Sequence, residues 1–560
     1  MPTVDIPGIK RAGLPVDLDR LTAEGDDWLS PEERYALKTY GVCAQAQPHV
    51  FMVRVRTNGA LQSATARALA GLAEQHGGGW IHLTTRQQIE FHHVHATKVA
   101  GLLEEIHDLG LTTSSACGHT MRGVMSCPLA GVGLDEPFDC SLDARLVTDA
   151  ILARARELNT QMPQRVNISF GGCAECRDHA KVNDAGFVSK VSDDGQPCYE
   201  LLLGGSLGKS SPMLALTAVD MLPRQAVLPA VYALFELFIE HGDFERPSKA
   251  RLKFLIQKMG EDAFLKLYLD LFEEHRQRSW PDPPPVTLPL SSSISEILSY
   301  APEGGWSAGV RPQRVPGWAL VTINVPLGDI YADELRLLAD VADDLADQHL
   351  HLTRNQNVML RWVPVEAVSA VKAALARVGL FVEGADQARD VRACTGGPIC
   401  SLAITPAQAA ATRLLDLPSL SRNSELRISV SGCPNACAQH QIADLGFSGG
   451  MVTIAGCQVL GYQVWAGADL REHRLSTVIG RVAESDVAAI TEAIVGVWEA
   501  LRERGEKLSD TIRRFGAEAF KAQIGAVFKG RWEPGPEPDG ALPGLVREDA
   551  QRRLPLVRRR

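Results

Sequence analysis

The chain has 560 residues, of which 45% are hydrophobic and 22% are charged, and its net charge is -10 at pH 7. A chain of this length and apolar content can bury large cores and is expected to form three or more domains. The negative charge argues against general nucleic-acid binding. Because the sequence shows neither the apolar segment of a signal peptide nor a run of about 18 apolar residues, it predicts a cytoplasmic protein without membrane contact.

A pattern of strands and helices begins after residue 40. Residues 1–40 are expected to form an amino-terminal extension with one short helix, which begins after Ser30. The elements predicted next are a strand from His49, a helix over 61–76, a strand over 79–94 and a helix over about 97–109.

Three segments recur later in the chain in the same order. The matched pairs are 81–94 with 350–363, Cys127 with Cys400, and 169–187 with 429–447, at offsets of 269, 273 and 260 residues. Collinear matches at nearly one offset predict two copies of one α/β unit.

The segments outside the two copies have distinct compositions. Residues 276–317 are rich in Pro, Ser and Gly and are expected to join the copies. Helices are predicted near 485–503 and 508–527, after the second copy. The tail from Trp532 is rich in Pro and Gly and is predicted to be disordered.

Four cysteines of the second copy stand in two close pairs, Cys394-x5-Cys400 and Cys433-x3-Cys437. Four thiolates in this pattern can hold an iron-sulfur cluster or a tetrahedral zinc ion. The flanking Gly, Pro and Ala residues favour the cluster, because they leave backbone N–H groups free and let a bulky cofactor approach. Zinc sites usually use tighter pairs of cysteines.

The first copy lacks this set of four cysteines. Near the equivalent places it has Thr120 or Met121, Cys127, Cys173 and Arg177, so only the second copy is expected to hold the cluster. Cys173-x2-Cys176 could be a redox or metal-binding pair. No second pair accompanies it and Cys176 is out of phase with Cys437, so we predict that this pair does not bind metal.

Cationic side chains show the opposite distribution. The first copy carries Arg54, Arg86 and Arg122, and at the matching offsets the second copy has Ile323, Asn355 and Thr395. Cations on one side and thiolates on the other are expected if an anionic cofactor and an anionic substrate bind between two pseudo-symmetric halves. A further basic run contains Arg246, Lys249, Arg251 and Lys253.

The pattern C-x5-C followed by G-C-P-N-A-C resembles that of the siroheme and 4Fe-4S enzymes that reduce nitrite or sulfite, and the resemblance extends from about residue 40 to about 525. It implies a mixed α+β fold with internal duplication. Two ferredoxin-like half-domains and two siroheme/4Fe-4S reductase domains would be related by pseudo-twofold symmetry. The implied parts are an extension 1–40, half-domains 41–112 and 318–385, reductase domains 113–275 and 386–530, a linker 276–317 and a tail 531–560.

The resemblance also implies a role for individual residues. Cys394, Cys400, Cys433 and Cys437 would bind the 4Fe-4S cluster, and the thiolate of Cys437 would be shared with the siroheme iron. The residues expected to bind the cofactors are Arg86, Arg246, Lys249, Arg251, Lys253, Asn435 and Cys437. The residues expected to bind the substrate anion are Arg54, Arg122, Arg165 and Asn167.

The substrate is predicted from Arg165-x-Asn167. Sulfite enzymes of the family resemble K-x-K at this motif and nitrite enzymes K-x-N. Sulfite is a dianion near neutral pH and gains from a second cation, whereas nitrite is a monoanion that can use a neutral amide donor. Asn167 therefore favours nitrite. Arg165 in place of lysine is one departure from the family pattern, and Glu90, where the family often has glutamine, is another.

The function implied by the resemblance is six-electron reduction of nitrite to ammonium, with reduction of sulfite to sulfide as the alternative. A precorrin-3B synthase-like monooxygenase and a cluster-bearing electron-transfer module are further alternatives. No G-x-G-x-x-G motif follows a strand and no flavin signature is present, so ferredoxin or a separate flavoprotein is expected to supply electrons.

Overall fold

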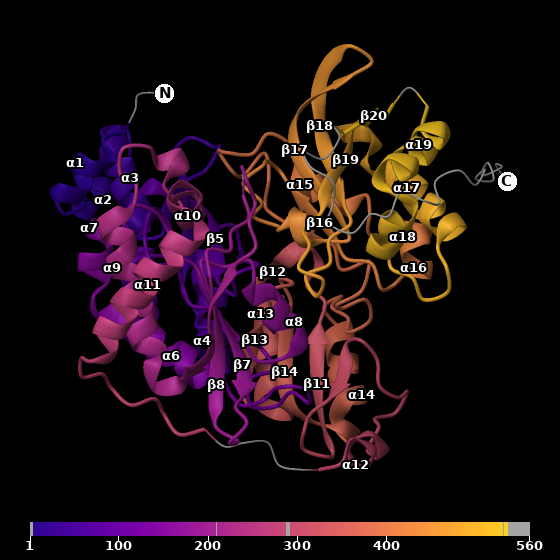
Figure 1. The fold of residues 1–560 in the computed structure, drawn as a ribbon, viewed down its shortest axis with the longest axis horizontal. Coiled ribbons are helices and arrows are strands. Elements are labelled where there is room, and N and C mark those ends of the chain that lie inside the picture. The colour runs from indigo at the N-terminus through magenta and orange to yellow at the C-terminus, as the bar shows by residue number, and fades with distance from the viewer. Residues whose placement is uncertain (1–3, 209, 287–291, 530, 536–560) are drawn as a thin grey trace. The chain divides into compact units, whose positions relative to one another are not determined.

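The computed structural model describes residues 4–208, 210–286, 292–529 and 531–535, with its elements labelled in Figure 1. The described chain divides into two compact units. The first comprises residues up to 206 together with 213–383, and the second comprises 207–212 together with the residues from 384 onward. None of the described helices has the length and apolar character needed to cross a membrane.

Two five-stranded sheets lie in the first unit, and each contains one strand from the other copy. The strand orders are β1-β2-β5-β4-β12 and β10-β11-β14-β13-β3, so the short strands β12 and β3 are exchanged. The first sheet contains β1 (Val42–Ala44), β2 (Val50–Val55), β5 (Ile89–His95), β4 (Trp80–Leu83) and β12 (Asp329–Tyr331). The second contains β10 (Val310–Pro312), β11 (Trp318–Ile323), β14 (Val358–Pro364), β13 (His349–Leu352) and β3 (Ala60–Gln62).

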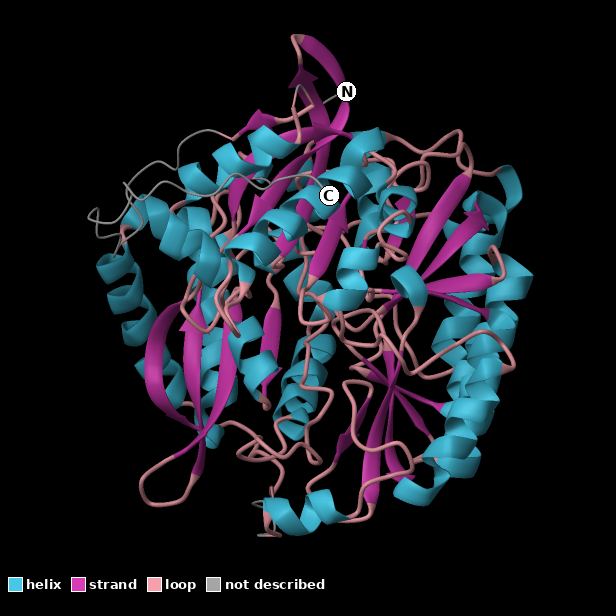
Figure 2. Ribbon diagram, turned by 90° about the vertical axis from the view of Figure 1, so that its right-hand side faces the viewer, coloured by secondary structure: helices cyan, strands magenta, loops and turns pink. Residues whose placement is uncertain are grey.

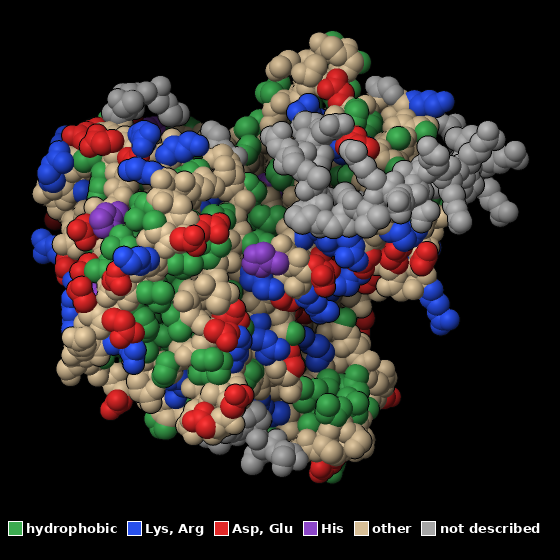
Figure 3. Space-filling model, in the orientation of Figure 1, with side chains coloured by type: hydrophobic (Ala, Val, Ile, Leu, Met, Phe, Trp, Pro, Cys, Tyr) green, Lys and Arg blue, Asp and Glu red, His purple; other side chains and the backbone are tan. Residues whose placement is uncertain are grey.

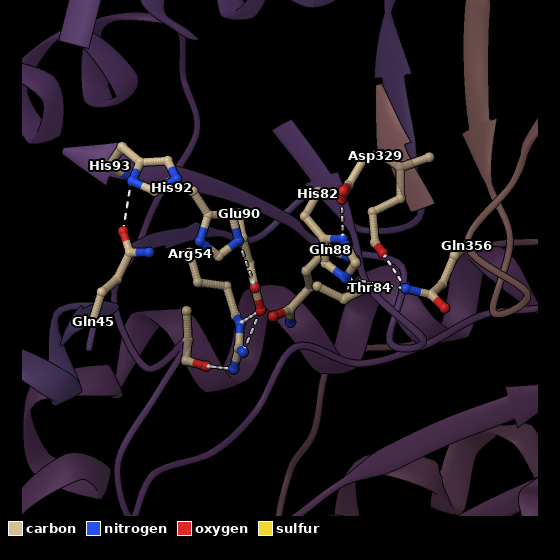
Figure 4. Close-up of polar contacts among 12 residues, drawn as sticks. Gln45, Arg54, His82, Thr84, Gln88, Glu90, His92, His93, Asp329 and Gln356 are labelled. Atoms are coloured by element: carbon tan, nitrogen blue, oxygen red, sulfur yellow. Dashed lines mark hydrogen bonds and ion pairs between the residues drawn. The ribbon is translucent and has the colours of Figure 1, made fainter. Parts of the chain in front are cut away.

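Reciprocal side-chain bonds accompany the strand exchange. Gln87 Nε2 donates to the carbonyl of Leu352 at 2.9 Å, and Gln356 Nε2 donates to the carbonyl of Leu83 at 2.9 Å. His82 on β4 lies 2.6 Å from the carboxylate of Asp329 on β12, as Figure 4 shows. The two copies in the first unit are therefore joined by backbone ladders and by buried polar contacts.

Alternation along the strands separates the core from the polar groups of the first unit. In β2 the side chains of Phe51, Val53 and Val55 are buried in the hydrophobic core, while Arg54 between them points to the other face. Amphipathic helices cover the sheets, and α4 (Ser63–His76) packs against α13 (Ala332–Leu345). Figure 2 shows such helices lying beside the strands.

A second kind of sheet occurs once in each unit. In the first unit its order is β6-β7-β8-β9, and in the second it is β15-β16-β17-β18-β19-β20. The first contains β6 (Ile168–Gly171), β7 (Ala185–Val191), β8 (Pro197–Leu203) and β9 (Leu216–Pro223). The second contains β15 (Arg392–Ala393), β16 (Ile428–Ser431), β17 (Leu445–Ile454), β18 (Cys457–Ala466), β19 (Thr477–Ala483) and β20 (Glu533–Pro534).

The backbone register confirms the predicted duplication. Ile168 pairs with Ala185 in the first unit, and Ile428 pairs with Leu445 in the second, so both members of the pair are shifted by the same 260 residues. An aspartate beside each strand pair accepts an equivalent backbone hydrogen bond. Asp184 accepts from the N–H of Asn167 and Asp444 accepts from the N–H of Arg427, both at 2.8 Å.

Helices complete both units. Those of the first unit are α1 (Ile6–Arg11), α2 (Leu18–Glu24), α3 (Pro31–Thr39), α5 (Val99–Asp108), α6 (Ser141–Ala153), α7 (Ala155–Gln161), α8 (Ala174–Ala180), α9 (Val227–His241), α10 (Leu252–Met259), α11 (Glu261–Arg276), α12 (Ile294–Ser299) and α14 (Val368–Ala376). Those of the second are α15 (Ala407–Thr412), α16 (Pro418–Arg422), α17 (Val487–Leu501), α18 (Leu508–Phe515) and α19 (Ala517–Val527).

Several elements differ from the sequence prediction. The amino-terminal extension contains three helices, and the predicted one is α3, which starts with a capping box between Ser30 and Glu33. The helix expected over 508–527 is two helices, because Gly516 between them has a φ of +83°. The predicted disordered tail was placed too early, since Trp532 is buried and β20 pairs with β19; residues 536–560 lie outside the described part.

The exchanged strand β3 is expected to stabilise the first unit. Leu61 is buried and is the register partner of Leu350, so Leu61→Ala should lower the free energy of unfolding by about 2–5 kcal/mol through a cavity in the shared core. The exposed neighbour Gln62 is the matched control, and Gln62→Ala should change it by less than about 0.5 kcal/mol. Denaturant unfolding of the full chain measures both, and equal midpoints would contradict a structural role for the exchange.

Candidate functional site

Arg54 and Glu90 face each other across the neighbouring strands β2 and β5. They are register partners, and Nε of Arg54 donates to Oε1 of Glu90 at 2.8 Å while Nη2 bonds the same oxygen. Oε2 of Glu90 lies 3.3 Å from Nε2 of His92, and Figure 4 shows the three side chains together. Burial alone would raise the pKa of the Glu90 carboxyl, but Arg54 and His92 hold it well below its usual range. Arg54, which was predicted to bind an anion, thus has an anionic partner within the protein.

Arg56, Arg86 and Arg122, also in the first unit, have guanidinium nitrogens that are buried and incompletely paired. Nε and Nη2 of Arg56, Nε of Arg86 and Nη1 of Arg122 are buried and have no hydrogen-bond partner among the described residues. Burial and the nearby charge of Arg122 lower the pKa of Arg56 to about 10 and that of Arg86 to about 9. Unpaired cations that repel one another in a buried place suit the binding of an anion with several carboxylates.

The backbone brings Arg122, Arg165 and Asn167 to one side of two paired segments. Met121 and Val166 form a parallel bridge, and the N–H of Arg122 donates to the carbonyl of Val166 at 3.0 Å. Met121 and Val166 are buried in the core. Adjacent side chains of an extended segment point to opposite faces, so Arg122, Arg165 and Asn167 point away from the core. The side-chain oxygen of Asn167 is buried and has no hydrogen-bond partner in the described part of the chain.

Asp184 connects this segment to the basic run. Its carboxylate accepts the N–H of Asn167 and two bonds from Nη2 of Arg251, at 3.0 and 2.9 Å. Asp184 is fully buried, so this is a buried and doubly bonded ion pair. Lys253, two residues after Arg251, interacts electrostatically with Arg251 and Arg165, and burial lowers its pKa to about 8.

Arg246 and Lys249 occupy a different environment from Arg251 and Lys253. Arg246 is 68% exposed, and its Nε donates to Asp243 at 2.7 Å. Lys249 is exposed, with its Nζ 4.6 Å from the centre of the Phe254 ring. The predicted role of these two residues in cofactor binding stays a prediction.

The four cysteines predicted to bind the cluster lie on neighbouring loops of the second unit. Cys394 follows β15, and Cys433 and Cys437 follow β16, which pairs with β15. Thr405, on the loop after Cys400, donates its N–H to the carbonyl of Gly432 at 3.0 Å. Gly432 has no room for a side chain, because a Cβ there would lie 2.8 Å from the carbonyl oxygen of Thr405. This close packing holds the loops of the two cysteine pairs together.

The donor set of these loops fits a 4Fe-4S cluster. Burial raises the pKa of the Cys394 thiol, and the charges of Cys437, Cys433 and Cys400 raise it further, so the four sulfurs are near one another. The N–H of Gly432 points to Sγ of Cys394 at 3.2 Å, as expected for a cluster sulfur that accepts backbone bonds. Cys437 and Asn435 are exposed, whereas Cys433 is buried. The thiol of Cys437 is therefore accessible at the surface of the second unit.

The strand registers correct two of the predicted equivalences. Arg54 pairs with Glu90 and Thr322 with Met359, so Thr322 and not Ile323 takes the place of Arg54 in the second copy. Met125 bridges Ser169 in the first copy, and Arg392 pairs with the equivalent Ser429 in the second. Met125 and Arg392 are therefore equivalent. Two residues further along, Cys127 corresponds to Cys394 rather than to Cys400. The residue offset between the two copies changes along the chain because of a short insertion. The sequence match placed this insertion wrongly and therefore paired the wrong residues.

Sequence reasoning missed two residues, Arg56 and Asp184, that lie beside the predicted arginines. Arg56 is the second arginine of the motif MVRVR, and its position just beyond the end of β2 could have suggested a role beside Arg54. Asp184 gave no comparable signal, because nothing in the local sequence connects it with Arg251. Its repeat partner Asp444 would have been the available clue.

The visible surface carries charges of both signs. Figure 3 shows Lys and Arg side chains interspersed with Asp and Glu rather than gathered into one basic stripe.

Family models match most of the chain. The model described as nitrite and sulphite reductase 4Fe-4S domain matches residues 117–276 and 384–531. The model described as nitrite/sulfite reductase ferredoxin-like half domain matches residues 44–109 and 311–378. Each model matches twice, in agreement with the duplication seen in the sheets.

Relatives and a solved structure extend over nearly the whole chain. A ferredoxin–nitrite reductase of Synechococcus elongatus is 26% identical over 531 residues, which are 92% of this chain and 96% of the relative. A ferredoxin sulfite reductase of Mycobacterium tuberculosis is 27% identical, covering 83% of this chain and 82% of the relative. The structure of the Mycobacterium tuberculosis NirA protein matches with a TM-score of 0.76 at 23% identity, covering 93% and 98% of the two chains, which shows the shared fold.

The two repeat-related aspartates should respond oppositely to loss of charge. Asp184→Asn removes the buried partner of Arg251 and should destabilise the protein by about 3–5 kcal/mol. In contrast, burial raises the pKa of Asp444 to about 6, above its usual 3.8. The folded state therefore binds more protons than the unfolded state between these pH values, and stability falls as pH rises through that window. Asp444→Asn should remove this loss, so at pH 7.5 it should be neutral or stabilising.

Thermal unfolding of both variants at pH 5 and pH 7.5 measures this difference. The chosen substitution keeps the shape and leaves an oxygen that can still accept the backbone N–H. An Asp444→Asn variant that is destabilised at pH 7.5 as strongly as Asp184→Asn would contradict the interpretation.

Proposed function

Because this chain belongs to the nitrite and sulphite reductase family, and is therefore an oxidoreductase with siroheme and a 4Fe-4S cluster as cofactors, we propose that it reduces nitrite to ammonium. The observation that carries the choice of nitrite is Asn167, a neutral amide beside Arg122 and Arg165. An amide donor suits a monoanion, whereas a second cation in its place would suit a dianion. The complete reaction uses six electrons and eight protons and yields ammonium and two waters.

The proposed anion site consists of Arg54, Arg122, Arg165 and Asn167. Arg122 and Asn167 share one side of the bridged segments, and Arg54 interacts electrostatically with Arg122. Guanidinium groups keep their protons at working pH, so their role is to hold the oxygens of the anion and to stabilise charge that develops on them. The open N–H capacity of Arg122 Nη1 supports this role, because it can donate to an oxygen of the anion.

The proposed siroheme-binding residues are Arg86, Arg246, Lys249, Arg251 and Lys253. Arg86 and Arg251 each retain a buried Nε without a partner among the described residues, which suits carboxylates of the macrocycle. The cluster would be held by Cys394, Cys400, Cys433 and Cys437, with Asn435 in the same loop. When bound, these cofactors supply single-electron transfer and a reducing iron centre.

Lys253 is a suitable proton carrier near the proposed anion site. Its pKa of about 8 lies well below the usual value for lysine, because it is buried and close to Arg251 and Arg165. An ammonium group with this pKa gives up a proton from Nζ more readily than an exposed lysine does near neutral pH. We assign to it the supply of protons through water to the anion held by Arg165.

The electron donor is proposed to be ferredoxin. Relatives from Synechococcus elongatus and Spinacia oleracea are named as ferredoxin–nitrite reductases. A separate flavoprotein is the alternative donor, because the chain shows no flavin or nicotinamide motif of its own. None of the twelve cysteines, all of which lie in the described residues, forms a disulfide; this suits a reducing compartment such as the cytoplasm, and nitrate assimilation is the proposed context.

Substrate preference can be tested with a variant of Asn167. The wild type is expected to turn over nitrite faster than sulfite with reduced viologen as donor, and Asn167→Lys should shift the ratio of kcat/KM values toward sulfite at least about tenfold, because it adds a cation. Asn167→Ala is the control, since it removes the amide without adding charge. A wild type that is faster on sulfite would establish the sulfite alternative.

Glu90 is expected to compete with the substrate for Arg54. Glu90→Gln removes the carboxylate that now binds Arg54, so KM for nitrite should fall roughly threefold to tenfold, because one charge-assisted bond no longer opposes anion binding. Since the pKa of Glu90 is far below neutral, the effect should be constant between pH 6 and pH 8. Glu105→Gln, at a carboxylate paired with His76 elsewhere, is the control. A raised KM in Glu90→Gln would instead show that Glu90 orients Arg54 for binding.

A further inference from the structure

A compact group of three thiols lies in the first unit. The sulfur atoms of Cys127, Cys173 and Cys176 all lie within 4.8 Å of one another. Cys127 and Cys173 are buried, and Cys176 is partly exposed. The sequence had predicted that the pair Cys173-x2-Cys176 does not bind metal, because no second pair accompanies it. The fold supplies the missing partner from Cys127, 46 residues earlier in the chain.

The backbone fixes all three thiols. Cys127 follows the bridge between Met125 and Ser169 on β6, so its segment runs beside that strand. Cys173 follows the end of β6, and Cys176 lies in the first turn of α8. The N–H of Cys173 donates to Sγ of Cys127 at 3.4 Å, which is the kind of bond a metal-bound thiolate accepts.

The trio occupies the place that corresponds to the cluster loops of the other unit. Cys127 is equivalent to Cys394 by strand register, and Cys173 is equivalent to Cys433 at the offset of 260. The bond from the N–H of Gly432 to Cys394 has its counterpart one residue later, in the bond from Cys173 to Cys127. The remaining equivalence is lost, because Arg177 stands where Cys437 stands, and Cys176 is the third thiol instead.

The spacing of the three sulfurs suits one metal ion rather than a second cluster. Sulfurs bound to a single tetrahedral zinc ion at about 2.3 Å lie about 3.8 Å apart, which agrees with three atoms grouped within 4.8 Å. A cubane places each cysteine on a different iron and therefore needs wider spacing. Among the described residues, no three of Cys394, Cys400, Cys433 and Cys437 form so tight a group.

We propose that Cys127, Cys173 and Cys176 bind one divalent ion of the zinc type, separate from the 4Fe-4S cluster. A C-x2-C pair and a third, distant cysteine are a common ligand arrangement for zinc. Such an ion would join the segment that carries Arg122 to the segment that carries Arg165 and Asn167, so its role is structural. The inference does not depend on which anion the enzyme reduces.

The surroundings of the trio suit a thiolate-bound ion. Three thiolates and a divalent ion leave one net negative charge. Two arginines, one buried and one partly buried, lie near the thiols, and Arg354 also forms an ion pair with Glu175. Arg354 interacts electrostatically with Cys176 and Cys173, and Arg361 interacts with Cys127. Both arginines come from the second copy of the half-domain, which places compensating charge beside the thiols of the first.

Two further side chains lie beside Cys127 and are candidates for a fourth ligand after a local shift, since neither lies within 4.8 Å of all three sulfurs. A Cβ placed on Gly172 would lie 3.3 Å from Cβ of Cys127, 3.4 Å from Sγ of Cys140 and 3.2 Å from Oε2 of Glu136. Glycine at this position therefore lets Cys140 and Glu136 approach Cys127. The side chain of Glu136 is fully buried, and neither carboxylate oxygen has a hydrogen-bond partner in the described part, although Arg314 lies 3.1 Å away.

Metal analysis of the full-length protein tests the proposal. Protein purified without oxygen from zinc-supplied cells should contain about one zinc per chain, with an X-ray absorption shell of sulfur at about 2.3 Å. Cys127→Ser and Cys176→Ser should each lose most of this zinc and keep the absorption bands of cluster and siroheme. Cys198→Ser, at a buried cysteine outside the trio, is the matched control and should keep zinc. Cys140→Ser and Glu136→Gln identify the fourth ligand by the change they cause in the zinc shell.

Three results would overturn the inference. The first is wild-type protein without zinc or another non-iron metal. The second is iron in excess of one cluster and one siroheme that is lost in Cys127→Ser, which would mean a second cluster. The third is a disulfide between two of the three cysteines, found by mass spectrometry of the anaerobic protein. Because the zinc measurement is made on the wild type, it gives an answer even if a variant does not fold.

Discussion

Positive charge buried in the first unit is the constraint on which the rest of the structure depends. Glu90 pairs with Arg54 and Asp184 with Arg251, but Arg56, Arg86 and Arg122 keep buried nitrogens without partners in the described chain. Taking an unpaired cation out of water costs several kcal/mol. Such a region is stable only where a large, well-packed core supports it and where binding of an anionic ligand offsets part of the free-energy cost of the buried charge. The two five-stranded sheets provide that core.

Duplication gives both copies the same frame and leaves the side chains free to diverge. Asp184 and Asp444 accept the same backbone bond, but Asp184 also forms an ion pair with the side chain of Arg251. Cys127 and Cys394 occupy equivalent positions, yet their neighbours differ in number and spacing. One backbone can therefore support a group of cationic side chains in the first unit and a set of four thiols in the second, because the register is fixed by main-chain bonds that do not depend on the side chains at the site.

The sequence predicted what depends on local pattern. Alternating residues around Arg54 predicted β2. The spacing of Cys394, Cys400, Cys433 and Cys437 predicted four thiols close together, and the loops of the second unit bring them near one another. Pairings between distant side chains could not be predicted, since neither the Arg54–Glu90 contact nor the thiol trio follows from spacing along the chain. The break between α18 and α19 was also missed, because the apolar periodicity continues across Gly516 and only its positive φ ends the helix.

The exchange of β3 and β12 makes the two copies mutually dependent. If the chain were divided between them, β4 and β13 would each become an open edge with unsatisfied N–H and C=O groups, and such edges promote aggregation. Neither half could then supply a partner for the edge strand of its own sheet. An ancestor with a single copy would have needed to meet a second molecule to complete its edges, and fusion of the two into one polypeptide would have made that encounter independent of concentration.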